Sequence, residues 1–300
     1  MKTDGNPPEY DPRDQEYQPS RRGRLSGVWG LSRRNRAAAA GLLIIAVLAL
    51  AAVFGRFVLP YNPYYGEMSQ NFRPPSALHW FGTDELGRDI FSRVVEGAHI
   101  TMGVGLSAVL IALTAGVVLG AAAGYYGRWA DTVIMRFMDM MLAIPDILLA
   151  IAIMSVLGPG VGKAVAAIGL VTIPQYARVA RGSVLSAKEN DYVAAARAVG
   201  NSDFRILAFH ILPNIVSPLI VRSALGISSA ILDAAALGFL GLGAPPPLAE
   251  WGTMLGSGRD YILSAPYILI FPGLAVTVCA LAFNLLGDGL QSALDPRNRR

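Results

Sequence analysis

Long apolar runs, separated by shorter charged segments, dominate the chain from Ala37 onward. A bilayer core is spanned by about 20 residues of helix. Segments that meet or approach this length are predicted to be six transmembrane helices, and they cover 37–59, 100–127, 140–162, 164–178, 219–242 and 261–287. The pattern therefore predicts an all-α polytopic membrane protein.

Composition agrees with this pattern and excludes a soluble domain. The 300 residues are 53% hydrophobic and 15% charged, with a mean hydropathy of +0.45. A typical soluble domain has about 25% charged residues. The single cysteine, Cys279, cannot form a disulfide within the chain and gives no information on redox compartment.

The distribution of basic residues predicts the orientation. Cytoplasmic segments collect Lys and Arg. The polar, proline-rich stretch 1–36 ends in an arginine cluster and is expected to be a disordered cytoplasmic tail. Segment 184–214 and the tail 291–300 are also basic, whereas loop 60–99 has more acidic than basic residues and is predicted to be extracytoplasmic. Both termini are then cytoplasmic, and residues 100–290 form the core domain.

A charged segment between the fourth and fifth predicted helices has its own helical pattern. Residues 191–199 are predicted to form a short helix, with Asp191 at its start and Gly200 ending it. Ser202 or Asp203 then caps a second short helix, which Pro213 ends. The sequence predicts a rigid helix–turn–helix at the membrane surface, suited to transmitting a push.

Four ionisable residues lie in or near the predicted transmembrane helices. Each is costly at mid-membrane, by about 2.5–3.5 kcal/mol on insertion scales. Arg136 and Asp139 are three residues apart and can pair on one helix face, so we favour a structural role for them. Asp146 lies inside the third predicted helix, and Asp233 is near the middle of the fifth. Pore lining and structural bonding remain equal alternatives for Asp233.

Glycines recur in the second predicted helix at Gly116, Gly120 and Gly124. Small residues on one face let helix backbones approach closely in lipid. Internal packing and an interface with another subunit are both consistent with this stripe.

Catalytic and metal-binding patterns are missing from the sequence. Residues 157–164 (LGPGVGKA) resemble a P-loop but lack its first Gly and its final Ser or Thr. The histidines His79, His99 and His210 have no metal-site spacing. We therefore expect no catalytic residue, no metal and no cofactor in this chain, so a partner must supply energy for any work.

Several motifs together resemble one family of transporters. Ala195-Ala196, three further residues, Gly200 and then Leu212-Pro213 resemble the "EAA" loop of ATP-binding-cassette (ABC) importer permeases. Ala194 stands where that loop usually has Glu, and His210 where it usually has Ile. Further segments resemble the dipeptide/oligopeptide/nickel branch, namely FGTDELGRDIFSR (81–93), LGFLGLG (237–243), WGTML (251–255) and FNLLGDGL followed by LDPR (283–297).

The resemblance covers about residues 80–300 and implies a type I ABC importer permease fold of the second-permease kind. It implies that a coupling helix docks on a cytoplasmic ATPase through Asp191, Ala194, Ala195, Ala196, Gly200, Asp203, Phe204 and Arg205. The implied partners are a homologous permease, two ATPase subunits that bind ATP and Mg, an extracytoplasmic substrate-binding protein, a peptide and membrane lipid, with no nucleic acid.

Two other functions remain open at this point. Nickel import belongs to the same branch, and selectivity lies largely in the binding protein. A stand-alone channel or ion-coupled transporter would use Asp146 and Asp233 as proton sites, although the surface helix–turn–helix argues against it.

Overall fold

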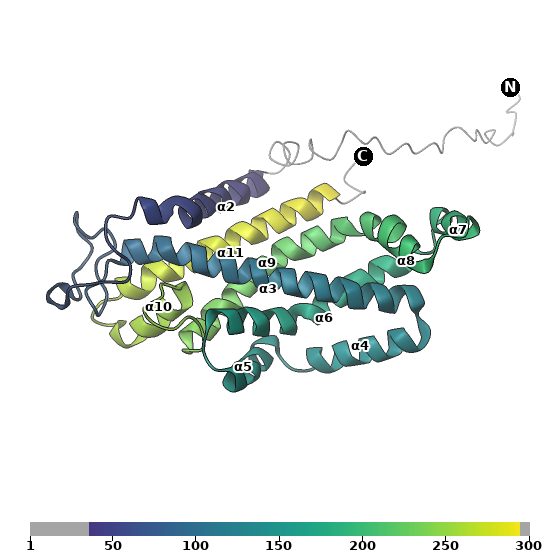
Figure 1. The fold of residues 1–300 in the computed structure, drawn as a ribbon. Coiled ribbons are helices and arrows are strands. Elements are labelled where there is room, and N and C mark those ends of the chain that lie inside the picture. The colour runs from purple at the N-terminus through teal and green to yellow at the C-terminus, as the bar shows by residue number, and fades with distance from the viewer. Residues whose placement is uncertain (1–35, 295–300) are drawn as a thin grey trace, which may run out of the picture.

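The structure is a computed structural model that describes residues 36–294, most of which are helical (Figure 1). The predicted tail 1–36 lies, apart from Arg36, outside the described residues, as does most of 291–300. The α-helices are α2 (Arg36–Phe54), α3 (Ile90–Tyr126), α4 (Arg128–Leu142), α5 (Asp146–Leu157), α6 (Val161–Ala187), α7 (Asp191–Ala198), α8 (Asp203–Arg205), α9 (Val216–Phe239), α10 (Trp251–Gly258) and α11 (Tyr267–Leu294).

Short irregular helices join these elements. A π-helix, η5 (Ile206–Ile211), follows α8, and 3-10 turns lie at η3 (Gly55–Phe57), η4 (Met68–Gln70), η6 (Leu212–Asn214) and η7 (Arg259–Tyr261). The described residues contain no strand, and their one β-bridge pairs Thr83 with Asp89. The all-α prediction is therefore confirmed for this part of the chain.

The long helices α2, α3, α6, α9 and α11 lie side by side along the long axis of the molecule (Figure 1). Helices α7 and α8 project at one end, which we call the α7 end. Helix α10 and the loop that precedes α3 lie at the other, which we call the α10 end. The start of α2 and the last turns of α11 both point toward the α7 end (Figure 1).

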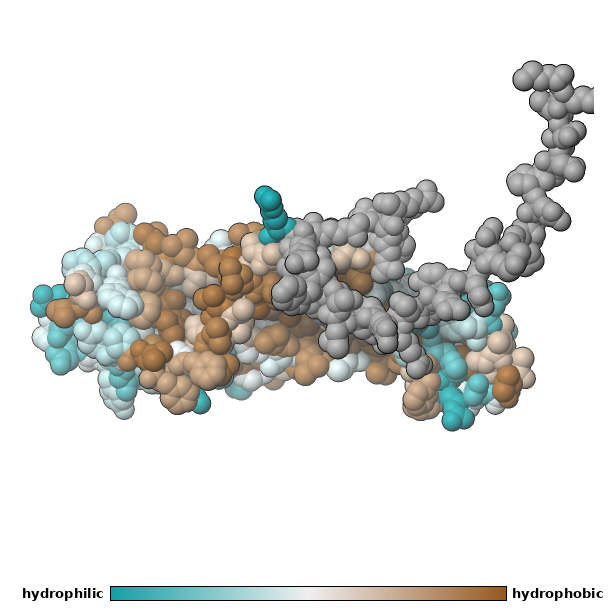
Figure 2. Space-filling view, turned by 90° about the horizontal axis from the view of Figure 1, so that it is seen from above, coloured by the Kyte–Doolittle hydropathy of each residue, from teal (hydrophilic) through white to brown (hydrophobic). Residues whose placement is uncertain are grey.

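Apolar surface covers the middle of the bundle on the face seen in Figure 2. Four described helices are long and apolar enough to cross a membrane: α2 with η3, α3, α9 and α11. The pair α4 and α5 adds a fifth if it counts as one bent span. Hydrophobic side chains gather over the middle of the molecule and hydrophilic ones at its two ends (Figure 2). The fourth predicted helix, 164–178, lies within α6, which carries Lys163, Arg178 and Arg181 and does not meet this criterion of length and hydropathy. Six crossings therefore stays a prediction.

The second predicted helix begins ten residues earlier than its apolar run. The sequence predicts a start at Ile100, whereas α3 begins at Ile90. Asp89 caps it, because its Oδ2 accepts the backbone N–H of Ser92 at 2.8 Å. Arg93 in the first turn is buried and donates to the Pro63 carbonyl at 2.7 Å. The length of the charge-free run underestimates the length of α3, because the preceding loop binds the charged side chain in the first turn of the helix.

The third predicted helix is broken. The sequence predicts one helix through Asp146, whereas α4 ends at Leu142 and α5 begins at Asp146, with an angle of 89° between them. Pro145, just before α5, lacks the N–H that would continue the hydrogen-bond ladder. Asp146 is therefore the first residue of α5, at a helix N-terminus that favours its negative charge.

The glycine stripe of α3 packs within the chain, which decides between the two alternatives left by the sequence. A Cβ on Gly116 would lie 2.9 Å from the Ile173 carbonyl oxygen of α6. A Cβ on Gly120 would overlap the Ala177 carbonyl oxygen. The stripe thus lets the backbones of α3 and α6 approach closely. Both of these helices end at the α7 end of the molecule.

Candidate functional site

The segment from Asp191 to Asn214, which we call the surface unit, forms a compact projection at the α7 end (Figure 1). Its first helix, α7, ends at a glycine, as predicted. Gly200 has φ +85°, and its N–H donates to the Arg197 carbonyl at 3.0 Å. The N–H of Asn201 donates to the Ala196 carbonyl at 3.2 Å. These two bonds form a Schellman cap, for which the left-handed conformation of glycine is well suited.

The start of α7 differs from the expectation. Asn190 is the N-cap residue and Asp191 the first helical residue, and neither side chain makes a capping hydrogen bond. The Asn190 side chain instead donates to the carbonyls of Ser186 and Ala187, near the end of α6. Asp191 still places a negative charge at the positive end of the short helix dipole.

Buried apolar side chains anchor the surface unit to the bundle. Val193 of α7 and Ile206 and Ile211 of η5 are at most 1% exposed. They share a cluster with residues of α3 and α6, namely Ala121, Ala180, Val184 and Ala187. Burial of this kind stabilises by roughly 1.5–3 kcal/mol for each large side chain. The unit therefore sits on α3 and α6 as a packed element.

Large apolar side chains are exposed on the outer face of the surface unit, beside charged ones such as Asp191 and Arg205. Val199, Phe204 and Phe209 are 84%, 74% and 70% exposed. The sequence places Phe204, Leu207, Ala208 and Ile211 on one side of a regular helix. The π-helix changes this register, so that Ile206 and Ile211 are buried while Phe204 projects outward. The surface unit thus has a fixed inner face and an unpartnered outer face.

Most of the predicted docking residues lie on the outside of the surface unit. Asp191, Ala194, Ala195, Phe204 and Arg205 are exposed. Ala196 is buried, and its carbonyl accepts the capping bond described above. The exposure of Ala194 shows that the glutamate usual at this position would also project outward.

Asp203 is held by a residue of the bundle. Its Oδ1 accepts the phenolic hydroxyl of Tyr125 at 2.7 Å. No local pattern predicts this contact, because the two residues are separated by 78 positions.

Two ion pairs join α4 to α6 near the α7 end of the bundle. Arg181 binds Asp131 through two hydrogen bonds of 2.5 and 2.6 Å. Arg178 donates to Asp139 at 2.7 Å, with both side chains more than half exposed. Asp139 therefore pairs with Arg178 of the neighbouring helix and not with Arg136, which corrects the expected pairing within α4. Arg136 is itself exposed on α4.

Two carboxylates lie near the break between α4 and α5. Asp146 accepts a hydrogen bond from the Gln175 side chain of α6 at 2.6 Å. Asp233 of α9 is half-buried and makes no hydrogen bond or ion pair with any described residue. Asp146 and Asp233 are close enough to repel each other electrostatically. The structure thus brings together two residues that the sequence places 87 positions apart.

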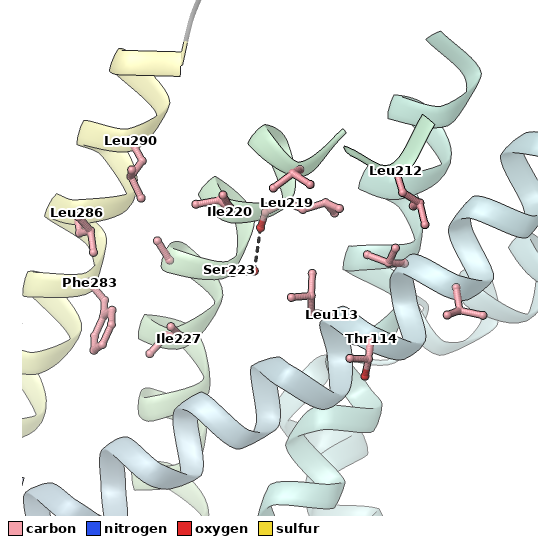
Figure 3. A pocket seen from close by; sticks show the side chains of 14 residues that line it. Leu113, Thr114, Leu212, Leu219, Ile220, Ser223, Ile227, Phe283, Leu286 and Leu290 are labelled. Carbon is pink, nitrogen blue, oxygen red and sulfur yellow. Dashed lines mark hydrogen bonds between the residues drawn. The ribbon is translucent and has the colours of Figure 1, made fainter. Parts of the chain in front are cut away.

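An apolar groove lies between α3, α9 and α11 (Figure 3). It encloses about 720 Å³, and its only polar side chains are Thr114 and Ser223. Each hydroxyl donates to a carbonyl of its own helix, at 2.8 Å to Leu110 and 2.8 Å to Leu219. The groove offers no free side-chain donor and is unsuited to the charged ends of a peptide.

A polar network orders the loop at the α10 end. Asp84 binds Arg88 at 2.6 Å, and Arg93 lies 3.5 Å from the same carboxylate. His79 contacts Asp89 at 3.0 Å through Nδ1. These residues belong to the FGTDELGRDIFSR motif or pack against it, so the motif builds the loop that precedes α3. His79 is therefore a hydrogen-bonded residue of this loop.

The loop also holds a partly buried tyrosine–glutamate contact. The Tyr64 hydroxyl donates to Glu96 Oε1 at 2.7 Å. Burial, together with the Glu96 carboxylate, raises the pKa of Tyr64 to about 12. Tyr64 therefore remains a donor across the physiological range and fixes the loop to the first turns of α3.

No group of three or more His, Cys, Asp or Glu side chains in residues 36–294 is arranged to hold a metal ion. The P-loop-like stretch forms the tight link between α5 and α6. Within it, the Gly160 N–H donates to the Gly243 carbonyl at 3.0 Å.

Comparison with known proteins identifies the family of this bundle. Residues 116–300 match the family described as "Binding-protein-dependent transport system inner membrane component". The chain belongs to this family. It is therefore a multi-pass inner membrane protein and a permease of the ABC transporter class. Residues 25–75 match the N-terminal TM domain of oligopeptide transport permease C.

Several curated relatives are similar to this permease over most of their length. The dipeptide transport system permease protein DppC of Alkalihalophilus pseudofirmus is 48% identical, over 88% of this chain and 87% of the relative. The di/tripeptide transport system permease protein DppC of Pseudomonas aeruginosa is 46% identical, over 91% and 92%. The glutathione transport system permease protein GsiD of Escherichia coli is 45% identical, over 90% and 89%.

A solved structure shares the fold of this permease. A chain of the MetNI methionine ABC transporter, in an inward-facing conformation, aligns with a TM-score of 0.55 and 16% sequence identity. The alignment covers 68% of the permease and 97% of that chain. The type I ABC importer permease fold implied by the sequence motifs is therefore confirmed.

Proposed function

We propose that this permease is the second membrane subunit of an ATP-driven importer of dipeptides or short oligopeptides. The names of its relatives support a peptide substrate, and glutathione, itself a tripeptide, falls within the same class. The match of residues 25–75 to oligopeptide transport permease C supports its position as the second permease. A homologous permease forms the other half of the pore.

In this proposal the permease crosses the membrane six times, and the α7 end faces the cytoplasm. Helix α6 supplies one of these crossings, although its charged residues lower its mean hydropathy. It has 27 residues, about 40 Å of helix, and packs along α3. The start of α2 and the end of α11 then lie on the cytoplasmic side, and the arginine-rich stretches that flank them follow the positive-inside rule.

The main support for this proposal is the surface unit, which is anchored on one face and unpartnered on the other. Val193, Ile206 and Ile211 fix it to α3 and α6, while Phe204 and Phe209 project outward. An ATPase subunit docked on this apolar outer face would bury both phenylalanines. Movement of the ATPase would then be carried into the bundle through α3 and α6.

The charged face of α4 and α6 lines the proposed translocation pathway. The Asp139–Arg178 pair is exposed, and charges exposed at membrane depth require water. A water-filled space between the two permeases supplies it. Arg136 lies on α4 on the α7 side of this pair, and Asp146 and Asp233 extend the same pathway toward the α10 end, where they offer negative charge to a peptide ammonium group.

The remaining components act in trans. ATP and Mg bind to two ATPase subunits, and an extracytoplasmic binding protein delivers the peptide to the α10 end. The permease itself contributes positioning and a pathway, without a catalytic residue or a cofactor of its own.

The test is reconstitution of this permease with the products of its chromosomal neighbours in proteoliposomes. We expect uptake of a labelled dipeptide to require ATP hydrolysis and the binding protein, with no uptake by the permease alone. Parallel assays with glutathione and nickel define the substrate class. ATP-independent uptake by the isolated permease would contradict the proposal. ATP-dependent uptake of nickel, with no uptake of peptide, would show that the substrate is nickel.

A further inference from the structure

The last turn of α3 receives the surface unit on both sides of α7. Lys188, three residues before the unit begins, donates from Nζ to the Gly124 carbonyl at 3.1 Å. Beyond α7, Asp203 accepts the Tyr125 hydroxyl at 2.7 Å. Arg197, near the end of α7, lies beside the same hydroxyl. The end of α3 therefore meets the segments before, within and after α7.

These contacts differ in kind from the apolar anchor of the unit. The buried cluster around Val193 and Ile206 is held by apolar burial, which is non-directional. A hydrogen bond between a phenol and a carboxylate is short and directional, with both partners fixed in geometry. The Tyr125–Asp203 bond therefore sets the angle at which the unit leaves the bundle.

Helix α3 extends from this bond to the opposite end of the molecule. It has 37 residues, about 55 Å of helix. At the α10 end, the Val94 carbonyl accepts the Trp251 indole N–H at 2.8 Å, and the Thr101 hydroxyl accepts the Trp251 backbone N–H at 3.3 Å. One continuous helix and the two hydrogen bonds to Trp251 thus connect Tyr125 with α10.

We infer that Tyr125 is a positioning residue that couples the surface unit to α3, and through α3 to the α10 end. The inference rests on the proposed function, because it takes the surface unit to be the element on which an ATPase acts. The buried cluster attaches the unit to α3 and α6, and the bond adds a directional contact that fixes the orientation of the unit relative to α3. Loss of the hydroxyl leaves the unit attached but allows it to move without α3.

The test uses Tyr125→Phe in the complete reconstituted transporter, with Tyr126→Phe as the matched control. Tyr126 is the next residue, is 56% exposed, and its hydroxyl has no hydrogen bond to a described residue. The readout is peptide transported per ATP hydrolysed, measured beside complex assembly and thermal unfolding. We expect Tyr125→Phe to lower this ratio about three- to tenfold, which corresponds to one hydrogen bond. Assembly and the unfolding temperature should be those of the wild type, because the bond is exposed.

Asp203 variants separate positioning from general damage. Asp203→Asn retains an acceptor oxygen and should keep at least half of the wild-type ratio, whereas Asp203→Ala should match Tyr125→Phe. The double variant Tyr125→Phe/Asp203→Ala should be no worse than either single variant, because both remove the same bond.

A wild-type ratio in Tyr125→Phe, or equal losses in Tyr125→Phe and Tyr126→Phe, would overturn the inference. A double variant whose losses multiply would also overturn it. Failure of the proposed function has a different result, since the wild-type complex would then show no ATP-dependent peptide uptake at all.

Discussion

Ala194 stands at the surface of the permease where the family motif usually has a glutamate. Its side chain is exposed on α7, whereas Ala196, two residues along the same helix, is 7% exposed. The two positions therefore differ in burial within one turn of helix. The missing glutamate changes the outer face of the surface unit and leaves its packing unaffected.

This difference gives a paired prediction. Ala194→Glu should change the free energy of unfolding by less than about 0.5 kcal/mol, as expected for an exposed site. Ala196→Glu should lower it by about 3 kcal/mol or more, because it buries a carboxylate without a partner. Thermal unfolding in detergent measures both, and co-purification with the ATPase should survive only in Ala194→Glu. Equal losses in the two variants would show that α7 packs through a different face.

Among the elements, the pair α3 and α6 depends most on small residues. A Cβ on Gly120 would overlap backbone atoms of Ala177, which cannot move away as a side chain can. Gly103, on the same helix, has no atom within 4 Å of an added Cβ. Gly120→Ala should therefore lower the free energy of unfolding by about 2–3 kcal/mol through overpacking.

Gly103→Ala is the control for this prediction. It should be neutral or gain up to about 1 kcal/mol, since alanine favours helix over glycine. Unfolding curves of both variants in the same detergent decide the comparison. A stable Gly120→Ala protein would mean that α3 and α6 do not pack at backbone distance.

Element by element, the sequence predicted best where apolar length alone decides. Helix α2, one uninterrupted apolar run, lies within five residues of its predicted range at each end. Helix α9, which contains Arg222 and Asp233, begins and ends three residues earlier than predicted, and α11 begins six and ends seven residues later. The start of α3 was missed because the partners that bury Arg93 come from a distant loop. The break before Asp146 was missed because an apolar run continues on both sides of it. The π-helix η5 has no sequence periodicity that would have identified it.

The same limit applies to the site. The Gly200 turn follows from local chemistry and was predicted. The Asp139–Arg178 and Tyr125–Asp203 contacts join residues 39 and 78 positions apart, so they depend on how the helices pack. Local spacing suggested Arg136 for Asp139 instead.

At the scale of the whole molecule, the proposed topology is open to direct labelling. The natural Cys279 is buried and should not react with a membrane-impermeant maleimide. It therefore serves as an internal control. Val199→Cys, at the α7 end, should label only from the cytoplasmic side of the membrane, and Leu263→Cys, near the α10 end, only from the opposite side. Their native side chains are 84% and 97% exposed. Labelling of both from one side would refute the proposed orientation.

In the proposed function, an ATPase drives this permease through the outer face of the surface unit. Phe204→Asp tests it most directly, since Phe204 is 74% exposed and contributes little to the folded bundle. Peptide uptake and ATP hydrolysis are measured together in proteoliposomes of the complete transporter. We expect an unchanged unfolding temperature and a loss of ATP-driven uptake of at least about tenfold, because the substitution places a charge in an apolar interface. Wild-type uptake by Phe204→Asp would contradict it.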